Sequence, residues 1–354
     1  MKRLWRAAGV AAVYIGTVIG AGFASGREIW EFFSRYGRQG RHGILLSALF
    51  LVYLGVKAML WGQRMEARSY RDFLFMVAGP RLGRLGEWLM TLFLLVLTGI
   101  MLAGAGAVTV QQGIPWAVGC WGTVFLAVLV LKRRLSGIKG VNMAVIPLLF
   151  LVGIMLQIKE TSGILWEQKP DSSGAWWILS ACQYSGYNLF LALPVLVTMY
   201  QLEKDPAVLR WGGVLGGIGL GALAFLFHQA ISGMDGFRWE LPLMMIIKGW
   251  GQVWGWIYAF VLWGELFSTL LAHAFGLATR LGWVNQRRYV WQLTLLLAGT
   301  VLISRVGFAD LIRLVYPVFG LFSILMLIPL ALKPLPVQNS KSGKSSRKHR
   351  IITE

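Results

Sequence analysis

Ten apolar runs, each close to the length that crosses a lipid bilayer, dominate this sequence. The runs lie at about 7–36, 44–61, 86–108, 116–131, 141–158, 175–200, 211–231, 253–277, 289–303 and 311–332. Charged residues make up only 14% of the chain, whereas soluble proteins carry about 25%. The pattern therefore predicts an all-α, polytopic membrane protein whose ten transmembrane helices lie in a lipid bilayer.

The basic residues indicate the orientation of these spans. Much of the net charge of +19 comes from Lys and Arg in short loops and in a C-terminal tail at 334–354. This is the positive-inside pattern of membrane proteins, and it does not predict a nucleic-acid partner. We expect both termini in the cytoplasm and a disordered tail, with Arg35, Arg38 and Arg41 in an outward-facing loop as the exception.

The sequence carries no motif typical of an enzyme or a primary pump. A nucleotide-binding loop, a zinc motif and a nucleophile elbow are all absent from it, so we expect neither hydrolysis nor a bound cofactor. An intramembrane enzyme would have only scattered carboxylates and histidines to use. Cys120 and Cys182 fall inside apolar runs, and we interpret both as reduced core residues.

Small residues interrupt the first apolar run near its middle. Between Tyr14 and Phe33 the run passes from an apolar helix to an amphipathic one. The interrupted segment consists of Gly20, Ala21, Gly22, Phe23, Ala24, Ser25 and Gly26. Open backbone at this depth is tolerated only where it is buried in protein or lines a polar cavity, so the break predicts a binding place for a polar solute. Close helix packing on the GxxxG pairs Gly16–Gly20 and Gly22–Gly26 is the alternative.

The sixth run carries a second set of small and polar residues at mid-span. The set consists of Tyr184, Ser185, Gly186 and Asn188. Pro194 follows one turn further on, where it removes a helix hydrogen bond. Paired interruptions in two halves of a chain indicate a transporter site at the interface of inverted repeats. We therefore expect one five-helix repeat at 1–160, a second at 161–333, and a small-molecule substrate held between the two breaks.

Two carboxylates lie at depths where charge is costly. Glu28 follows the first break and Glu265 lies in the eighth run, so both are candidates for ion coupling or gating. The structural alternatives for the first segment are a capping box of Ser25 with Glu28 and an ion pair of Arg27 with Glu31 on the helix surface.

The eighth run also presents a polar stripe. Glu265, Ser268, Thr269 and His273 fall on one side of a helix with 100° between successive residues. A stripe this polar should face the protein interior or a cavity. Hydrogen bonding between neighbouring helices is the alternative for Ser268 and Thr269.

The first run resembles a known family signature. The stretch from Tyr14 to Glu28, YIGTVIGAGFASGRE, is similar to the signature of the YkvI-type bacterial membrane proteins, and QYSGYN in the sixth run fits that family less distinctively. These proteins are similar to the amino acid–polyamine–organocation superfamily, whose members share the leucine-transporter fold. The resemblance covers all ten runs and implies a five-plus-five inverted repeat in a bacterial cytoplasmic membrane, with helices 1 and 6 broken around the substrate.

The same resemblance implies a place for a coupling ion. Members of this fold that use Na⁺ bind it between carbonyls of the first break and adjacent hydroxyls of the eighth helix. The matching groups here are the carbonyls of Gly20 and Phe23 and the hydroxyls of Ser268 and Thr269. Coupling to protons through a carboxylate is the alternative.

Together these features predict an ion-coupled secondary active transporter. The cargo of the wider superfamily implies a small organic solute, similar to an amino acid. A membrane receptor that has kept the transporter fold, and binds its solute without moving it, is the alternative. The substrate, the coupling ion, the direction of coupling and the oligomeric state stay open at this point.

Overall fold

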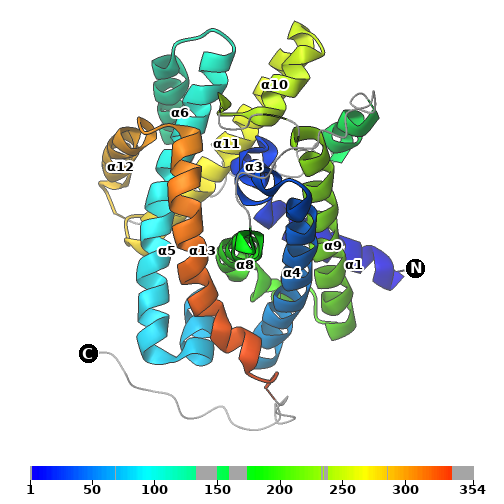
Figure 1. Ribbon diagram of the computed structural model, residues 1–354. Helices are drawn as coiled ribbons and strands as arrows, with labels where there is room; N and C mark the ends of the chain where they lie inside the picture. The colour runs from blue at the N-terminus through cyan, green and yellow to red at the C-terminus, as the bar shows by residue number, and fades with distance from the viewer. Residues whose placement is uncertain are drawn as a thin grey trace.

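The structure is a computed structural model that describes residues 2–67, 69–132, 150–158, 174–232, 234, 238–284 and 286–336. Within these ranges every regular element is helical (Figure 1), so the predicted all-α class is confirmed. Three predicted features lie wholly or partly outside the described residues. They are the first half of the fifth span, most of the connection at 160–174, and most of the basic tail at 334–354.

The first half of the chain begins with a broken span. Its helices are α1 (Lys2–Val18), α2 (Ala21–Ala24), α3 (Arg27–Phe32), the 3₁₀ turn η1 (Ser34–Tyr36), α4 (Arg38–Met65), α5 (Tyr70–Gln111), α6 (Trp116–Leu131) and a helical segment at 150–158. Gly79, with a φ of 82°, and Pro80 kink α5, so that a short amphipathic stretch precedes the predicted third span.

The described part of the second half contains one helix more than the predicted spans. Its elements are α8 (Trp176–Leu196), the 3₁₀ turn η3 (Met199–Gln201), α9 (Pro206–Ile231), α10 (Pro242–Gly249), α11 (Gln252–Arg280), α12 (Tyr289–Ser304) and α13 (Phe308–Leu332). The short helix α10 lies between the seventh and eighth spans. Every predicted span that falls within the described residues coincides with a helix.

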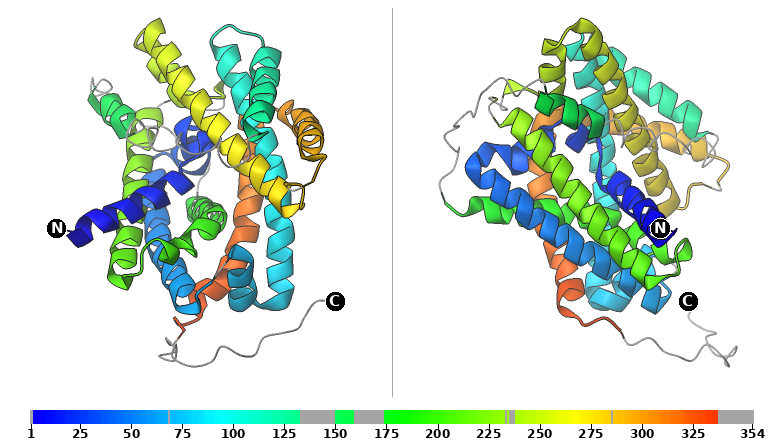
Figure 2. Two further views of the ribbon diagram at one scale, coloured as in Figure 1. Left: turned by 180° about the vertical axis from the view of Figure 1, so that it is seen from behind. Right: turned by 90° about the vertical axis from the view of Figure 1, so that its right-hand side faces the viewer.

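Helix α8 lies at the centre of the molecule. Figure 1 shows it nearly end-on between α4 and α13, and it packs against both of these helices and against α1. Helix α5 packs along α11 and α12 on the other side of α13. Figure 2 shows α11 running diagonally across the back of the molecule, and α1 crossing α9.

Glycines on α9 permit two helices to approach it closely. A Cβ atom on Gly216 would lie 2.5 Å from the ring of Tyr14 in α1, and one on Gly213 would lie 2.6 Å from the side chain of Val56 in α4. Small residues of this kind are common at helix contacts in membranes, where backbones pack directly against neighbouring side chains. The glycine-rich stretch of α9 is therefore a packing face, as its composition indicates.

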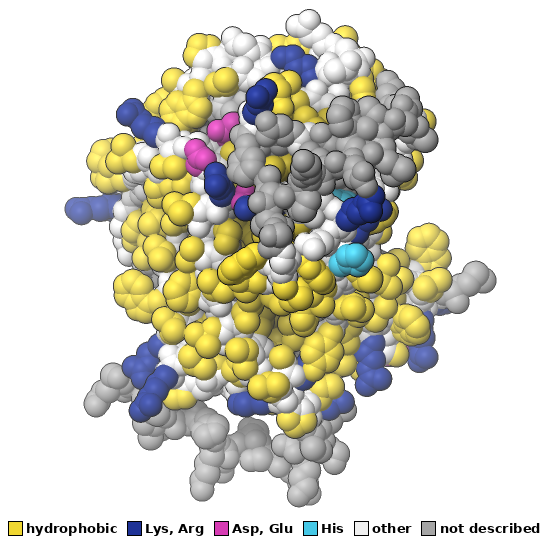
Figure 3. Space-filling view, in the orientation of Figure 1, with side chains coloured by type: hydrophobic (Ala, Val, Ile, Leu, Met, Phe, Trp, Pro, Cys, Tyr) yellow, Lys and Arg dark blue, Asp and Glu magenta, His cyan; other side chains and the backbone are white. Residues whose placement is uncertain are grey.

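The surface of the molecule is that of a membrane protein. Within the described residues, five helices are long and apolar enough to cross a bilayer, namely α4, α5, α9, α11 and α13, and α6 and α12 are shorter apolar helices. Figure 3 shows a broad apolar belt across one face, with Lys and Arg side chains gathered at its lower edge. Both cysteines are free, Cys120 buried and Cys182 half-buried.

Candidate functional site

The first span is broken twice, so the predicted interruption is present. Helix α1 ends at Val18, and Gly20 is fully extended, with φ −125° and ψ −177°, before the single turn of α2. Gly26 then adopts the left-handed conformation, with φ 80°, before α3 begins. Glycine is the residue that takes this conformation without steric cost. A Cβ on Gly20 would meet no atom of the described chain within 4 Å, so the described residues leave open space beside the first break.

The second break is held from outside by other elements. The carbonyl of Ser25 accepts a hydrogen bond of 3.0 Å from the amide of Leu243 at the start of α10. The carbonyl of Ala24 accepts one of 2.5 Å from the hydroxyl of Tyr258 in α11. These contacts satisfy backbone groups that the broken helix leaves without intrahelical partners. The break at 25–26 is therefore packed against α10 and α11, whereas the described residues leave space beside the break at Gly20.

The capping box, which was the structural alternative for Ser25 and Glu28, does not form. Ser25 donates to the carbonyl of Gly22 at 2.8 Å and accepts from the amide of Arg27 at 3.2 Å, and Gly26 is the residue at the helix cap. The carboxylate of Glu28 points elsewhere, toward α8. The Arg27–Glu31 pair does form, at 3.4 Å, but both side chains are buried and not on a helix surface as expected. Glu31 also binds Arg35.

Glu28 lies in the protein interior between the broken first span and α8. The hydroxyl of Tyr187 donates a hydrogen bond of 2.5 Å to its carboxylate. A Cβ atom on Gly22 would collide with the same carboxylate, so the glycine of α2 makes room for it. Glu28 is only 5% exposed and forms no ion pair with a basic side chain of the described residues. A buried carboxylate without a cationic partner costs about 2.5 kcal/mol or more in a membrane, so it favours a proton or a cation.

Aromatic side chains surround this carboxylate. The ring of Tyr187 lies 4.9 Å from that of Tyr316 in α13 and 5.5 Å from that of Phe32 in α3, measured between centroids. Tyr184 packs edge-on against Phe32 at 5.6 Å. The Tyr184 hydroxyl is buried and has no hydrogen-bond partner within the part of the chain that the structure describes. An unpartnered buried hydroxyl is costly, which makes it a candidate contact for a polar ligand or water.

The predicted break at Tyr184 to Asn188 is wrong, because α8 continues through it as a regular helix. Ser185 donates to the carbonyl of Ala181 at 2.8 Å and Asn188 to that of Tyr184 at 3.0 Å, so both bond the preceding turn of their own helix. A Cβ on Gly186 would lie 3.1 Å from the carbonyl oxygen of Gly320, so this glycine serves the approach of α13.

The regular helix of the sixth span ends shortly after Pro194, close to the predicted end of the span. Helix α8 ends at Leu196, and a turn at 197–198 leads into η3. The proline cannot donate the backbone hydrogen bond to the turn before it, which weakens the helix at this point.

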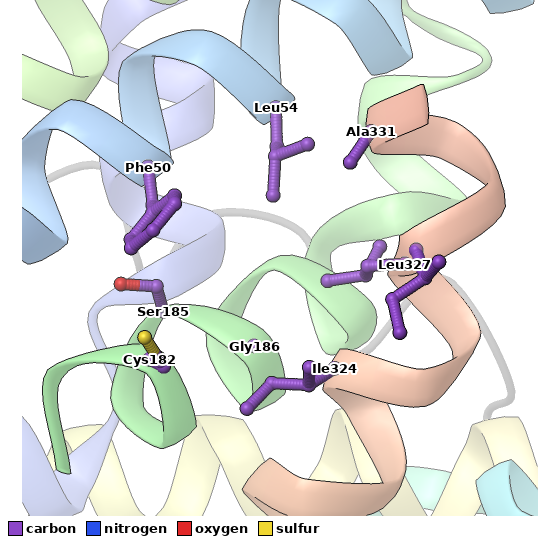
Figure 4. Close-up of a pocket in the computed structure, with 9 residues that line it drawn as sticks. Phe50, Leu54, Cys182, Ser185, Gly186, Ile324, Leu327 and Ala331 are labelled. Carbon is purple, nitrogen blue, oxygen red and sulfur yellow. The ribbon is translucent and has the colours of Figure 1, made fainter. Parts of the chain in front are cut away.

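The four predicted substrate residues of α8 point in two directions. Tyr184 faces the aromatic cluster of α3, and Asn188 lies one helical turn further along the same side. Ser185 and Gly186 instead line a cavity between α4, α8 and α13 (Figure 4). Only the first pair lies on the side of Glu28.

The polar stripe of α11 is buried at two of its four residues. Glu265 is 3% exposed and Ser268 5%, while Thr269 and His273 are half-buried. The hydroxyl of Ser268 donates to the carbonyl of Glu265 at 3.2 Å, and its oxygen keeps capacity to accept. Helix α11 also packs against α2, which carries the carbonyl of Phe23. The structure thus brings together the helices of the expected sodium ligands.

Several residues of this site were not predicted from the sequence. Tyr187, Tyr258 and Leu243 hold the broken span, and the carbonyl of Trp239 accepts a hydrogen bond of 3.2 Å from Arg27. Helical spacing could have pointed to Tyr187, because it lies three residues after Tyr184 and therefore on the same helical face. The others come from a distant segment, and no local pattern points to them.

These features define a class of protein: a helical membrane protein with a broken first span and a buried carboxylate beside the break. The manganese transporter of Eremococcus coleocola shares the fold, with a TM-score of 0.53 and 15% identity over 93% of this chain and 78% of that chain. No protein-family model matches the chain.

Two proteins of Bacillus subtilis (strain 168) are similar in sequence over nearly their whole length. Membrane protein YkvI is 31% identical over 338 residues, which cover 94% of this chain and 97% of YkvI. Protein YyaD is 25% identical over 341 residues, which cover 94% of this chain and 98% of YyaD. The chain therefore belongs to the YkvI family of membrane proteins, as its first-span signature indicates.

Proposed function

We propose that this protein is a secondary active transporter of a small organic solute similar to an amino acid, coupled to protons through Glu28. One observation carries the proposal: Glu28 is buried beside the broken first span and is bound by Tyr187 of α8, without a cationic partner among the described residues. The fold, shared with a transporter, supports the general class.

The helix contacts support a five-plus-five inverted repeat with halves at 1–160 and 161–333. In such a repeat α1 corresponds to α8, α4 to α9, α5 to α11 and α6 to α12. The packing of α1 on α9 then corresponds to that of α4 on α8, and both contacts are present. The packing of α5 on α12 corresponds in the same way to that of α6 on α11, and both are again present. Ten spans with both termini in the cytoplasm of a bacterial cell are part of this proposal.

The solute would bind at the first break, between Gly20 and the aromatic side of α8. The last turn of α1 leaves carbonyl oxygens without intrahelical partners, and the first turn of α2 leaves amide groups. These groups suit the ammonium and carboxylate ends of a zwitterion. The open space at Gly20 and the unpartnered hydroxyl of Tyr184 are the two structural features that favour this place.

Proton coupling would act through the contact between α3 and α8. Gain or loss of a proton changes the charge of Glu28 and hence the strength of its hydrogen bond to Tyr187. That bond joins the outer part of the broken span to the central helix, so the charge state biases how firmly the two are held together. Glu265, buried on α11, is the second carboxylate that can carry the proton.

A sodium site of Gly20, Phe23, Ser268 and Thr269 is the alternative means of coupling. It is favoured by the packing of α2 on α11, the helix that carries the polar stripe. The double substitution of Ser268 and Thr269 by Ala should then abolish a dependence of solute binding on Na⁺. Wild-type binding that is the same with and without Na⁺ would exclude this site.

The test of transport is uptake by purified protein in proteoliposomes. A thermal-shift screen of amino acids and amines in detergent first identifies a stabilising solute. A radiolabelled form of that solute should then accumulate in proteoliposomes when an inward proton gradient is imposed. Binding in detergent without accumulation under a proton or sodium gradient would favour the receptor function instead.

A further inference from the structure

A cavity of about 130 Å³ lies on the side of α8 that faces away from Glu28. Figure 4 shows Phe50 and Leu54 of α4, Cys182 and Ser185 of α8, and Ile324 and Ala331 of α13 around it. Aliphatic cavities of about 150 Å³ stay dry and bind molecules the size of benzene. The Ser185 hydroxyl already donates to its own helix, so the lining offers too few polar partners to hold water.

The cavity lies beside helix faces that are turned to the lipid. On α4, Leu49 is 59% exposed and Tyr53 51%, and on α13, Leu325 is 44% exposed and Ile328, which lines the cavity, 43%. In a membrane-spanning protein, exposed apolar side chains at mid-helix contact acyl chains. A hydrocarbon chain of the bilayer can therefore reach the cavity from the side.

Positive charge gathers at the end of the cavity where α13 finishes. Lys57 donates to the carbonyl of Ala331 at 2.6 Å, Arg64 to that of Pro336 at 2.8 Å, and Lys333 to that of Val77 at 2.7 Å. None of these three cations forms an ion pair with a carboxylate of the described chain. Glu66, at the end of α4, is the acidic residue nearest to them in sequence, and it too forms no such pair.

We propose that an anionic phospholipid of the bilayer binds here, with part of one acyl chain in the cavity and its phosphate beside Lys57. The site combines a dry apolar cavity with cations that have no carboxylate partner among the described residues, which is the complement of such a lipid. The proposal is independent of transport, because it concerns the opposite face of α8 from Tyr187.

Phosphatidylglycerol and phosphatidylcholine distinguish a charge-specific site from a general lipid contact. Added to the delipidated protein in detergent, phosphatidylglycerol should raise the melting temperature more than phosphatidylcholine does. Lys57→Gln should lower the affinity for phosphatidylglycerol about fivefold, measured as the lipid concentration that gives half of the rise in melting temperature. One cation near a lipid headgroup contributes about that factor to the affinity. Lys204→Gln is the matched control, because Lys204 also lies over a tyrosine ring, at 5.0 Å compared with 5.1 Å for Lys57, but away from the cavity.

The rates at which the two native cysteines are alkylated test whether lipid enters the cavity. Phosphatidylglycerol should slow alkylation of Cys182 by N-ethylmaleimide, read by peptide mass spectrometry, and leave buried Cys120 unchanged. Equal effects of the two lipids, equal responses of the two lysine variants, or a Cys182 rate that phosphatidylglycerol does not alter would each overturn the proposal.

Discussion

Replacing Tyr187 with Phe removes a single oxygen atom from the contact between α8 and α3, and its effect should depend on Glu28. The two side chains are 3% and 5% exposed and are joined by a hydrogen bond of 2.5 Å. A hydrogen bond to a charged group contributes about 1.5–3 kcal/mol, and one between neutral groups about 0.5–1.5 kcal/mol. The Phe ring fills the same space, so we expect a loss of about 2 kcal/mol in the free energy of unfolding wherever Glu28 is ionised.

A double-mutant cycle isolates the contribution of this hydrogen bond to the free energy of unfolding. In a Glu28→Gln background the hydroxyl meets a neutral amide, so at an alkaline pH, where the wild-type carboxyl is ionised, the same substitution should cost about 1 kcal/mol less. The free energy of unfolding can be measured by titrating the protein with SDS in mixed micelles. Tyr258→Phe is the matched control, because its hydroxyl bonds the neutral carbonyl of Ala24, also at 2.5 Å. It should cost the same in both backgrounds. An equal cost of Tyr187→Phe in both backgrounds would refute a charged contact at Glu28.

Two further perturbations test the packing and the inner end of the first span. Gly216→Ala should lower the free energy of unfolding by about 1–3 kcal/mol, because its Cβ would lie 2.5 Å from Tyr14. Gly264→Ala is the control: its Cβ would meet no described atom within 4 Å, so the same measurement should show no loss or a gain. Arg6 binds Glu203 at 2.8 Å and holds the pKa of that carboxyl below its ordinary value of 4.5. The wild type should therefore melt above Arg6→Gln at neutral pH, and this advantage should disappear as the pH falls below 4.5 through the lowered pKa of Glu203. An advantage that is equal at all pH values would mean that the ion pair adds nothing.

The helices and the first break follow from patterns that the sequence displays directly. Apolar runs of bilayer length predict spans, since backbone groups in hydrocarbon must be bonded within a helix. The run of small residues from Gly20 to Gly26 predicts an interruption because no stretch of strong helix formers competes with it. Both inferences depend only on local composition, and within the described residues the helices and the first break are found where they were predicted.

The sixth span shows where such reasoning fails. A glycine that breaks a helix and one that admits a neighbouring helix look alike in sequence, and Gly186 is of the second kind because Gly320 lies against it. The amide of Asn188 likewise bonds its own helix and leaves no gap in it. The contact of Tyr187 with Glu28 joins residues 159 positions apart, so only the packing of α3 on α8 reveals it.

The most direct measurement compares solute movement by the wild type and by Glu28→Gln in proteoliposomes. Proton coupling through Glu28 predicts that the wild type accumulates labelled solute when a proton gradient is imposed. The Glu28→Gln variant should still exchange labelled for unlabelled solute across the membrane but should no longer accumulate it, because its side chain cannot release a proton. Glu265→Gln, measured in parallel, shows whether the second buried carboxylate shares this role. Accumulation by Glu28→Gln that still follows the proton gradient as it does in the wild type would contradict the assignment of Glu28 as the coupling residue.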